Sequence, residues 1–312
     1  MKTFVVVNPR AGGGRARRDW PTIERRLRAA IGLFHHAETT APGHATTLTR
    51  QAILGGANQV IAVGGDGTLN ETINGFTQAD GSFSSDVCFG AIAVGTGSDF
   101  VRSLATSASL AHLIGLIAAG NTRRIDIGRM TFADDQGNQK VRLFANIASF
   151  GISGQIDRAV NAIRDDQFIP RKILFLGATV RALMKYKSQR VRMIVDNRPA
   201  VEAEIAVVAI ANGRYFGGGM LVAPDAELDD GLFDVVTIHA ASKLVLLRDL
   251  QMIYGGRHCN HPSISIQRAR QVTVEALDES RTGPVLLDVD GESPGKLWAT
   301  YDIRAGALKL LC

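Results

Sequence analysis

The segment that most constrains the fold is residues 64–71, which read Gly-Gly-Asp-Gly-Thr-Leu-Asn-Glu. An apolar run at 60–63 precedes this octet and a helical pattern at 69–76 overlaps its end, which predicts a strand, a tight turn and a helix start in succession. That geometry aims backbone N–H groups at an anion, usually a phosphate. Asp66 lies inside the turn, where its carboxylate would repel phosphates unless a Mg²⁺ ion lay between them. The octet therefore predicts an enzyme that handles a metal-bound nucleotide, with an ordinary glycine-rich turn as the alternative.

The octet departs from the commonest phosphate-binding motifs. A Walker loop ends in Gly-Lys-Ser/Thr, and a dinucleotide fingerprint would need a third glycine where Asn70 stands. The octet instead resembles the signature of the superfamily of diacylglycerol kinases, sphingosine kinases and NAD kinases. Other segments narrow the resemblance to the bacterial lipid kinases related to diacylglycerol kinase, and it extends from the N-terminus to at least Glu292. These segments are residues 8–14, 95–100, 224–231 and 290–292.

The composition is that of an ordinary globular protein, since 46% of the 312 residues are hydrophobic and 21% are charged. This length suits one large or two modest domains with an ample core. No apolar run reaches the roughly 20 residues of a membrane span, and the N-terminus shows no signal-peptide pattern. Cys88, Cys259 and Cys312 have no paired spacing, which favours a reducing compartment. We therefore expect a cytoplasmic protein, with peripheral contact at the inner membrane surface.

The net charge is +5, and much of the excess lies in residues 15–28 and 171–192. Positive charge suits ATP, nucleic acid or anionic lipid, but no aromatic and basic module accompanies it, so nucleic acid is the weakest of the three. Residues 171–187 predict a helix with an apolar face and with basic residues that include Arg181 and Lys185. This pattern is typical of a membrane-surface helix, and a helix packed on its own domain is the alternative.

The first third of the chain alternates short apolar strands with amphipathic helices. The predicted strands are 4–7, 33–37, 59–63 and 87–94, and the predicted helices are 19–31 with Asp19 as its cap, 44–54, 69–76 and 109–119. This alternation predicts a doubly wound α/β nucleotide-binding domain. Ligands of such sheets bind beyond the carboxyl ends of the strands, and the glycine motifs fall at that edge.

From residue 125 onwards the pattern is mostly short strands, interrupted by helical segments at 173–186 and 242–254. This predicts a β-rich second domain, so the domains are expected at 1–123 and 124–312. The glycine run at 213–219 would form either a wall of a cleft or a hairpin loop. The resemblance implies that the second domain is an antiparallel β-sandwich that binds the lipid, with the last strand packed back on the first domain. It also implies an active site in the cleft between the domains.

The resemblance implies which residues surround the nucleotide. Backbone N–H groups of the loops at 8–14 and 64–68 would hold the phosphates. For Thr40, whose motif is short, a solvated turn residue is an equal alternative. The implied residues are Asn8, Gly12, Thr40, Gly64, Gly65, Asp66, Gly67, Thr68, Leu69, Asn70, Glu71, Gly95 and Thr96.

Asp66, Asp99 and Asp126 each lie at or near the end of a predicted strand. The matching positions of the resembled kinases organise the Mg²⁺ that accompanies ATP, so the resemblance implies a catalytic role for all three. Isolated surface carboxylates are the alternative. Ser98 stands where the family usually has asparagine, and its hydroxyl would still hydrogen-bond but with a shorter reach.

Two further sites are implied in the second half. Glu292 follows the strand predicted at 285–289, and the resemblance makes it the general base for the lipid hydroxyl; a solvated turn carboxylate is the alternative. Asp230 through its side chain, and Glu227 and Leu232 through their carbonyls, would bind a structural Mg²⁺. A plain Asp-Gly turn is the alternative for that loop.

The sequence thus predicts an ATP- and Mg²⁺-dependent lipid kinase that phosphorylates a hydroxyl of a lipid such as diacylglycerol. NAD kinase or another small-molecule kinase of the same superfamily is the alternative enzyme. A non-catalytic nucleotide-binding regulator is the alternative of another class. The acceptor lipid and the oligomeric state, a homodimer included, stay open.

Overall fold

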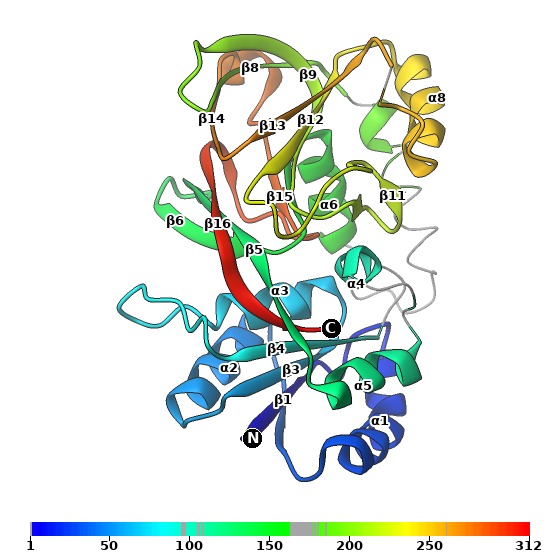
Figure 1. The fold of residues 1–312 in the computed structure, drawn as a ribbon. Coiled ribbons are helices and arrows are strands. Elements are labelled where there is room, and N and C mark those ends of the chain that lie inside the picture. Colours follow the sequence, from blue (N-terminus) through cyan, green and yellow to red (C-terminus); the bar gives the residue numbers. More distant parts are fainter. Residues whose placement is uncertain are drawn as a thin grey trace. The chain divides into compact units, whose positions relative to one another are not determined.

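The computed structural model describes residues 2–94, 98–104, 107, 109–162, 177, 179, 181–184, 186–259 and 261–312, with side chains left undescribed at 160–162, 244, 247 and 249–251. The chain divides into two compact units, Met1–Ile127 with Ala305–Cys312, and Gly128–Arg304. Two long strands, β5 (Thr122–Ala133) and β16 (Lys296–Leu311), contribute residues to both units (Figure 1). The domain limits at 1–123 and 124–312 stay predictions.

The first unit is built on a parallel sheet with the strand order β2-β1-β3-β4-β16. Its strands are β1 (Thr3–Val7), β2 (His35–Glu38), β3 (Gln59–Gly64), β4 (Cys88–Ala93) and the C-terminal end of β16. Every residue of β3 is buried, as expected for a continuous apolar strand covered on both faces. Lys309 and Leu310 of β16 pair with Cys88 and Phe89 of β4.

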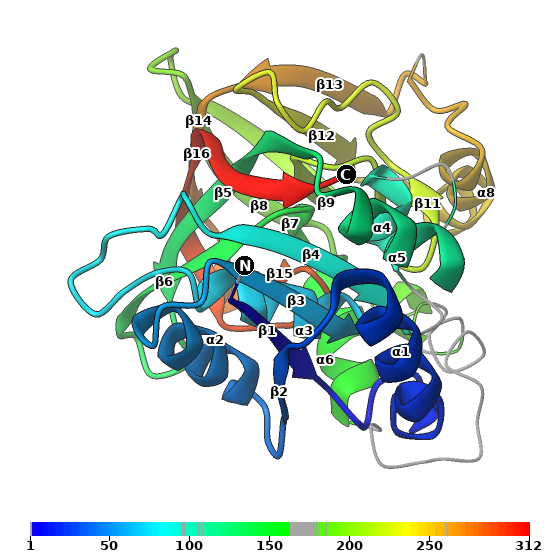
Figure 2. The same ribbon diagram turned by 60° about the horizontal axis from the view of Figure 1, so that its bottom comes forward.

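Helices cover both faces of this sheet (Figure 2). Val5, Ile61 and Ile92 pack against apolar residues of α1 (Arg15–Ile31) and α5 (Leu110–Ala119). Successive strand residues point to opposite faces, so Phe89 points the other way, where its ring meets Phe76 at a centroid distance of 6.1 Å. Phe76 lies two residues after the end of α3 (Asp66–Asn74), and α3 packs beside α2 (His44–Leu54). This is the predicted doubly wound α/β fold.

The first helix begins earlier than its sequence pattern indicates. We expected Asp19 to cap it, but α1 begins at Arg15 with Gly14 as its cap, and Pro21 lies inside the helix. Gly12, Gly13 and Gly14 all have positive φ, a conformation that glycine adopts without steric cost. The glycines therefore turn the chain directly from β1 into the helix.

The second unit is β-rich, as predicted, and its strand pairings are antiparallel. Its strands besides β5 and β16 are β6 (Gln139–Phe144), β7 (Ile147–Gly151), β8 (Gln189–Val195), β9 (Val201–Ala211), β12 (Phe233–His239), β13 (Ile264–Ala269), β14 (Gln271–Ala276) and β15 (Leu287–Val289). β9 pairs with β12 along one edge. Along its other edge it pairs with β8 over its first half and with β7 over its second half, so the sheet branches there.

The two branches of this sheet share one core. Phe150 of β7 stacks on Tyr301 of β16 at 6.3 Å between ring centroids, and Phe144 stacks on Phe233 at 5.6 Å. All four rings are wholly buried. Alternating strand residues thus meet from both branches, as the inward faces of a β-sandwich do.

The remaining elements of this unit are α6 (Ile152–Ala162), α8 (Lys243–Tyr254), α9 (Glu279–Thr282) and a ribbon of β10 (Tyr215–Phe216) with β11 (Met220–Leu221). The glycine run at 217–219 is the loop of that ribbon, so the hairpin interpretation is the one observed. Half of the positions of the helix predicted at 173–186 lie outside the described residues. No helix in the described part of the chain is long and apolar enough to cross a membrane.

Candidate active site

The octet joins β3 to α3 through the turn that its glycines predict. β3 ends at Gly64, and α3 begins at Asp66 with Gly65 as its cap, so Asp66 lies in the first helical turn. A Cβ atom on Gly64 would lie 2.5 Å from Thr68 Oγ1, so this position admits only glycine without rearrangement. The turn therefore brings the backbone of the strand against the first turn of the helix.

The loop after β1 is tied to this turn by Asn8. Its backbone N–H donates to the Val63 carbonyl oxygen at 2.9 Å, and its Nδ2 donates to Thr68 Oγ1, also at 2.9 Å. Its own Oδ1 accepts the Arg10 N–H at 3.0 Å, which shapes the loop ahead of Gly12. Two glycine loops that are far apart in the sequence are thus fixed to each other by one side chain.

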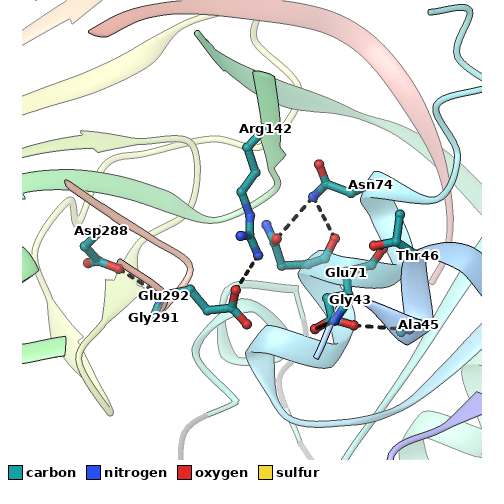
Figure 3. A network of polar contacts seen from close by, with 10 residues as sticks. Gly43, Ala45, Thr46, Glu71, Asn74, Arg142, Asp288, Gly291 and Glu292 are labelled. Carbon is teal, nitrogen blue, oxygen red and sulfur yellow. Dashed lines mark hydrogen bonds and ion pairs between the residues drawn. The ribbon is translucent and has the colours of Figure 1, made fainter. Parts of the chain in front are cut away.

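Glu71 holds a third loop in place (Figure 3). Its Oε1 accepts the Gly43 N–H at 2.8 Å and its Oε2 accepts the Ala45 N–H at 3.1 Å, at the start of α2. A carboxylate at a helix N-terminus satisfies N–H groups that the helix leaves unpaired. Glu71 therefore caps α2, and the loop that it fixes carries Thr40, whose Oγ1 lies 3.0 Å from His44 Nδ1.

Two other residues of the octet point into the protein. Leu69 is 1% exposed and belongs to the core, so only its backbone is available to a ligand. Asn70 is equally buried, and its Oδ1 accepts a hydrogen bond from Asn74 Nδ2 at 3.1 Å. Gly95 and Thr96 lie outside the described residues.

Asp66 faces the beginning of α4 (Asp99–Leu104), a helix that the sequence patterns did not indicate. Its Oδ1 accepts the Phe100 N–H at 3.2 Å. Burial raises the pKa of Asp66, while hydrogen bonds from the backbone N–H groups of residues 98–100 oppose the rise. The structure therefore brings Asp66 and Asp99 to neighbouring elements. Ser98 has φ of 59°, a left-handed conformation that asparagine adopts more readily than serine.

Asp126 is held differently. It lies in β5, is 1% exposed, and its Oδ1 accepts the Gly306 N–H at 2.6 Å. A hydrogen bond this short to a carboxylate is charge-assisted. Asp126 is thus tied to β16, whereas Asp66 is tied to α4.

Glu292 follows a tight hairpin turn in the second unit. Val289 and Glu292 exchange backbone hydrogen bonds of 2.8 and 3.1 Å across Asp290 and Gly291, both of which have positive φ, as in a type I′ turn. The carboxylate of Glu292 meets Arg142 of β6, with 2.6 Å between Oε2 and Nη2 (Figure 3). Sequence reasoning missed Arg142, because an arginine in a strand of alternating pattern carries no signal of a partner 150 positions away.

The predicted Mg²⁺ loop is closed by its own side chain. Asp230 Oδ1 accepts the Leu232 N–H at 2.9 Å, and the Arg268 guanidinium contacts the other carboxylate oxygen. Burial, followed by the charges of Asp225 and Glu227, raises the pKa of Asp234. In the described ranges, no three or more His, Cys, Asp or Glu side chains are grouped as metal ligands. An acidic loop of oxygen donors suits Mg²⁺, but a bound ion would share Asp230 with Arg268, and the site stays a prediction.

Comparison with known families covers both units. A model described as the diacylglycerol kinase catalytic domain matches residues 2–130, and one described as the YegS C-terminal NAD kinase beta sandwich-like domain matches residues 146–312. The chain thus combines an α/β unit that has linked glycine loops with a β-sandwich-like unit, and each unit matches a family model. This combination defines a kinase of the superfamily that includes NAD kinases. The chain belongs to the diacylglycerol kinase-like family of lipid kinases.

Individual proteins agree with this assignment. A diacylglycerol kinase of Staphylococcus saprophyticus is 27% identical over 94% of this chain and 89% of its own length. A crystal structure of a Bacillus anthracis protein assigned as a diacylglycerol kinase has a TM-score of 0.77 at 23% identity, covering 99% of this chain and 96% of that one. An Archaeoglobus fulgidus NAD kinase in complex with ATP has a TM-score of 0.51 at 13% identity, covering 100% and 94%. The two structures are similar in fold, and they confirm the predicted fold class.

Proposed function

We propose that this kinase transfers the γ-phosphoryl group of ATP, with Mg²⁺, to a hydroxyl group of a lipid such as diacylglycerol. The observation that carries the proposal is the side-chain hydrogen bond from Asn8 to Thr68, which ties together the two glycine loops that are proposed to bind the phosphates. Phosphoryl transfer depends mainly on positioning and on neutralising phosphate charge, and two loops held together in this way support the positioning.

The nucleotide side of the proposed reaction belongs to the first unit. Backbone N–H groups of Gly12 and of residues 64–67 hold the phosphates, whereas the Thr68 N–H donates to the Gly65 carbonyl oxygen at 2.9 Å. Gly95 and Thr96 are further predicted contacts. Glu71 acts indirectly, because both of its carboxylate oxygens cap α2 and so fix the loop of Thr40. Glu71 is therefore proposed to act by holding a nucleotide-binding loop in place.

The carboxylates of Asp66, Asp99 and Asp126 are the proposed Mg²⁺-organising groups. These carboxylates would hold Mg²⁺, which would supply positive charge to offset the phosphate charge that otherwise repels the attacking oxygen. The raised pKa of Asp66 supports a site built for a cation, because burial disfavours its charge until a partner arrives.

Glu292 is the proposed general base. It takes the proton of the lipid hydroxyl as that oxygen bonds to the γ-phosphorus and the bond to ADP breaks. The ion pair with Arg142 supports this role by holding the carboxylate at one place beside its turn.

The proposal is tested by incubating the purified protein with radiolabelled ATP and a panel of lipids in detergent micelles, with NAD in parallel. We expect labelled lipid phosphate that forms only with Mg²⁺ present. Phosphorylation of NAD instead would assign the alternative enzyme, which the likeness in fold to an NAD kinase supports. Nucleotide binding without transfer to any acceptor would contradict both and would leave a regulatory protein.

Diacylated lipids rarely leave a bilayer, so a kinase that acts on such a substrate has to bind at the membrane surface. The segment at 181–187 supports reversible contact there. Ala182, Leu183 and Tyr186 are buried in the core of the second unit, whereas Arg181 and Lys187 are exposed. Lys185 lies outside the described residues. The segment is thus packed on its own unit and presents basic side chains outward.

A further inference from the structure

Two carboxyl groups lie next to each other near the turn of Glu292, that of Asp157 of α6, which is half-buried, and that of Asp288 of β15, which is buried. Asp288 is 4% exposed, and its carboxyl group forms a side-chain hydrogen bond with that of Asp157. An ionised carboxylate only accepts hydrogen bonds, so two carboxylates bond to each other only when a proton lies between them. A pair of carboxyl groups bonded in this way holds one shared proton.

Asp288 also anchors the turn that carries Glu292 (Figure 3). Its Oδ1 accepts the N–H of Gly291, the residue before Glu292, at 3.0 Å. Its Oδ2 lies 2.8 Å from Ser149 Oγ, which lies 2.8 Å from Ser153 Oγ. One carboxyl group thus links the turn to β7 and, through Ser153, to α6.

The surroundings of the pair favour a single negative charge. Burial and the neighbouring Asp157 raise the pKa of Asp288 well above its ordinary value, and burial raises the pKa of Asp157. Among the described residues, the titratable groups that face Asp288 are Asp157 from α6 and Tyr301 from β16, with Ser149 facing it from β7. Neither titratable group is a cation, so a second negative charge would find no opposite charge beside it.

We propose that Asp288, through the proton it shares with Asp157, is a positioning residue that holds the turn of Glu292, and that losing this proton at alkaline pH releases the turn and slows phosphoryl transfer. The proposal rests on the proposed role of Glu292. Asp290 supports the same turn from the other side, because its carboxylate accepts the Ile147 N–H at 3.0 Å. The turn therefore depends on two acidic anchors, of which one is coupled to a proton.

The sign of the pH dependence follows from the direction of the pKa shift. A carboxyl group with a raised folded-state pKa stabilises the fold while it is protonated, and this stabilisation is lost as the pH rises through the raised value. Above it, two adjacent carboxylates repel each other in the core. The anchor therefore weakens on the alkaline side.

The test compares Asp288→Asn with Asp288→Ala in the full-length protein, using the lipid acceptor found in the assay above. Asparagine keeps an acceptor for Gly291 and a donor for Asp157, but it does not titrate. We expect Asp288→Asn to retain kcat near pH 7 and to lose the alkaline decline of the wild type. We expect Asp288→Ala to lower kcat about 10²-fold with little change in KM for ATP, the usual cost of a misplaced catalytic group.

The matched control is Asp196→Ala, because the Asp196 carboxylate likewise accepts backbone N–H groups, those of Arg270 and Gln271, at another turn of the same unit. It should leave kcat and its pH profile unchanged. An unchanged kcat in a folded Asp288→Ala, or an unchanged alkaline decline in Asp288→Asn, would overturn the proposal.

A second measurement separates this inference from the proposed reaction. Amide hydrogen exchange of Gly291, followed by NMR, reports the anchor without any substrate. Exchange at Gly291 should be faster in Asp288→Ala than in the wild type. As the pH is raised into the alkaline range, exchange should increase more in the wild type than in Asp288→Asn. Equal exchange in all three proteins would refute the anchoring role of Asp288, even if lipid phosphorylation is found. The expected differences in exchange would uphold that role, even if no lipid is phosphorylated.

Discussion

At the scale of single residues, the proposed chemistry depends on carboxylates in contrasting surroundings. Asp66 is ringed by backbone N–H groups at the start of α4, Asp126 is bonded to Gly306, and Glu292 is paired with Arg142. The carboxylates of Asp66 and Asp126 accept hydrogen bonds from uncharged backbone N–H groups, whereas the carboxylate of Glu292 pairs with a positively charged guanidinium group. Substitutions that keep shape and remove charge therefore separate their roles.

Asp66→Asn keeps an acceptor for the Phe100 N–H and removes the charge that Mg²⁺ requires. We expect turnover to fall by about 10²–10³-fold, the usual cost of removing one electrostatic stabiliser of a transition state. Asp86→Asn is the control, because the Asp86 side chain is 98% exposed and its partner Arg124 is 3.5 Å away. Steady-state kinetics in saturating Mg²⁺ measure both, and a variant with more than half of the wild-type activity would remove Asp66 from the metal site.

Glu292→Gln keeps the turn and removes the basic oxygen. We expect kcat to fall by about 10²–10⁴-fold, the usual contribution of a general base. The KM for ATP should stay within a few-fold of the wild-type value, because the proposed role of Glu292 concerns the acceptor. Glu279→Gln, at the first position of α9 in the same unit, is the control. Normal turnover with weakened ATP binding would move Glu292 to the nucleotide side.

At the scale of elements, the loops of the first unit are positioned by helix caps. Glu71 of α3 caps α2 with both carboxylate oxygens, so Glu71→Ala should cost about 0.5–2 kcal/mol of unfolding free energy, the usual effect of losing a cap. The KM for ATP should rise because the loop that carries Thr40 loosens. Urea unfolding monitored by circular dichroism measures the first effect, with the exposed Glu38→Ala as control. An unchanged midpoint would mean that the cap contributes little to stability.

The basic segment at 181–187 belongs to this scale as well. Reversing Arg181 and Lys187 to glutamate should weaken sedimentation with anionic vesicles, most strongly at low salt, where exposed charges are least screened. Reversal of the exposed Arg25 and Arg26 in α1 changes the net charge equally and is the control. Equal losses in both variants would indicate a general charge effect, and no loss in either would contradict membrane contact through this segment.

At the scale of the whole molecule, binding of a second metal ion would raise the thermal stability of the protein. Ligands that bind only the folded state raise the melting temperature, and the rise grows with the ratio of ligand concentration to Kd. If the loop of Asp230 holds Mg²⁺, added MgCl₂ should raise Tm in the wild type and raise it less in Asp230→Asn, without ATP present. Asp196→Asn should respond like the wild type. Equal shifts in all three proteins would leave Asp230 as the partner of Arg268 alone.

Much of the fold could be predicted because the local pattern of apolar residues and glycines indicates the helix, strand or turn that is observed. Residues 60–63 are apolar and continuous and form a strand buried along its whole length, and the observed turn that follows leaves no room for a side chain at Gly64. β12 occupies the predicted limits, 233–239. The short α4 escaped prediction because six residues carry too little periodicity. The start of α1 was misplaced because its cap is a glycine, which sequence patterns read as loop.

The sequence by itself determined the order of strands, glycine turns and helices, and with it the superfamily signature, because these depend on neighbours within a few positions. The partners of the acidic residues were decided only by tertiary structure. Arg142 meets Glu292 across 150 positions, and Ser149 meets Asp288 across 139. Such pairs form because β6, β7 and β15 belong to one antiparallel fold, and strand register, rather than local sequence, sets which side chains meet.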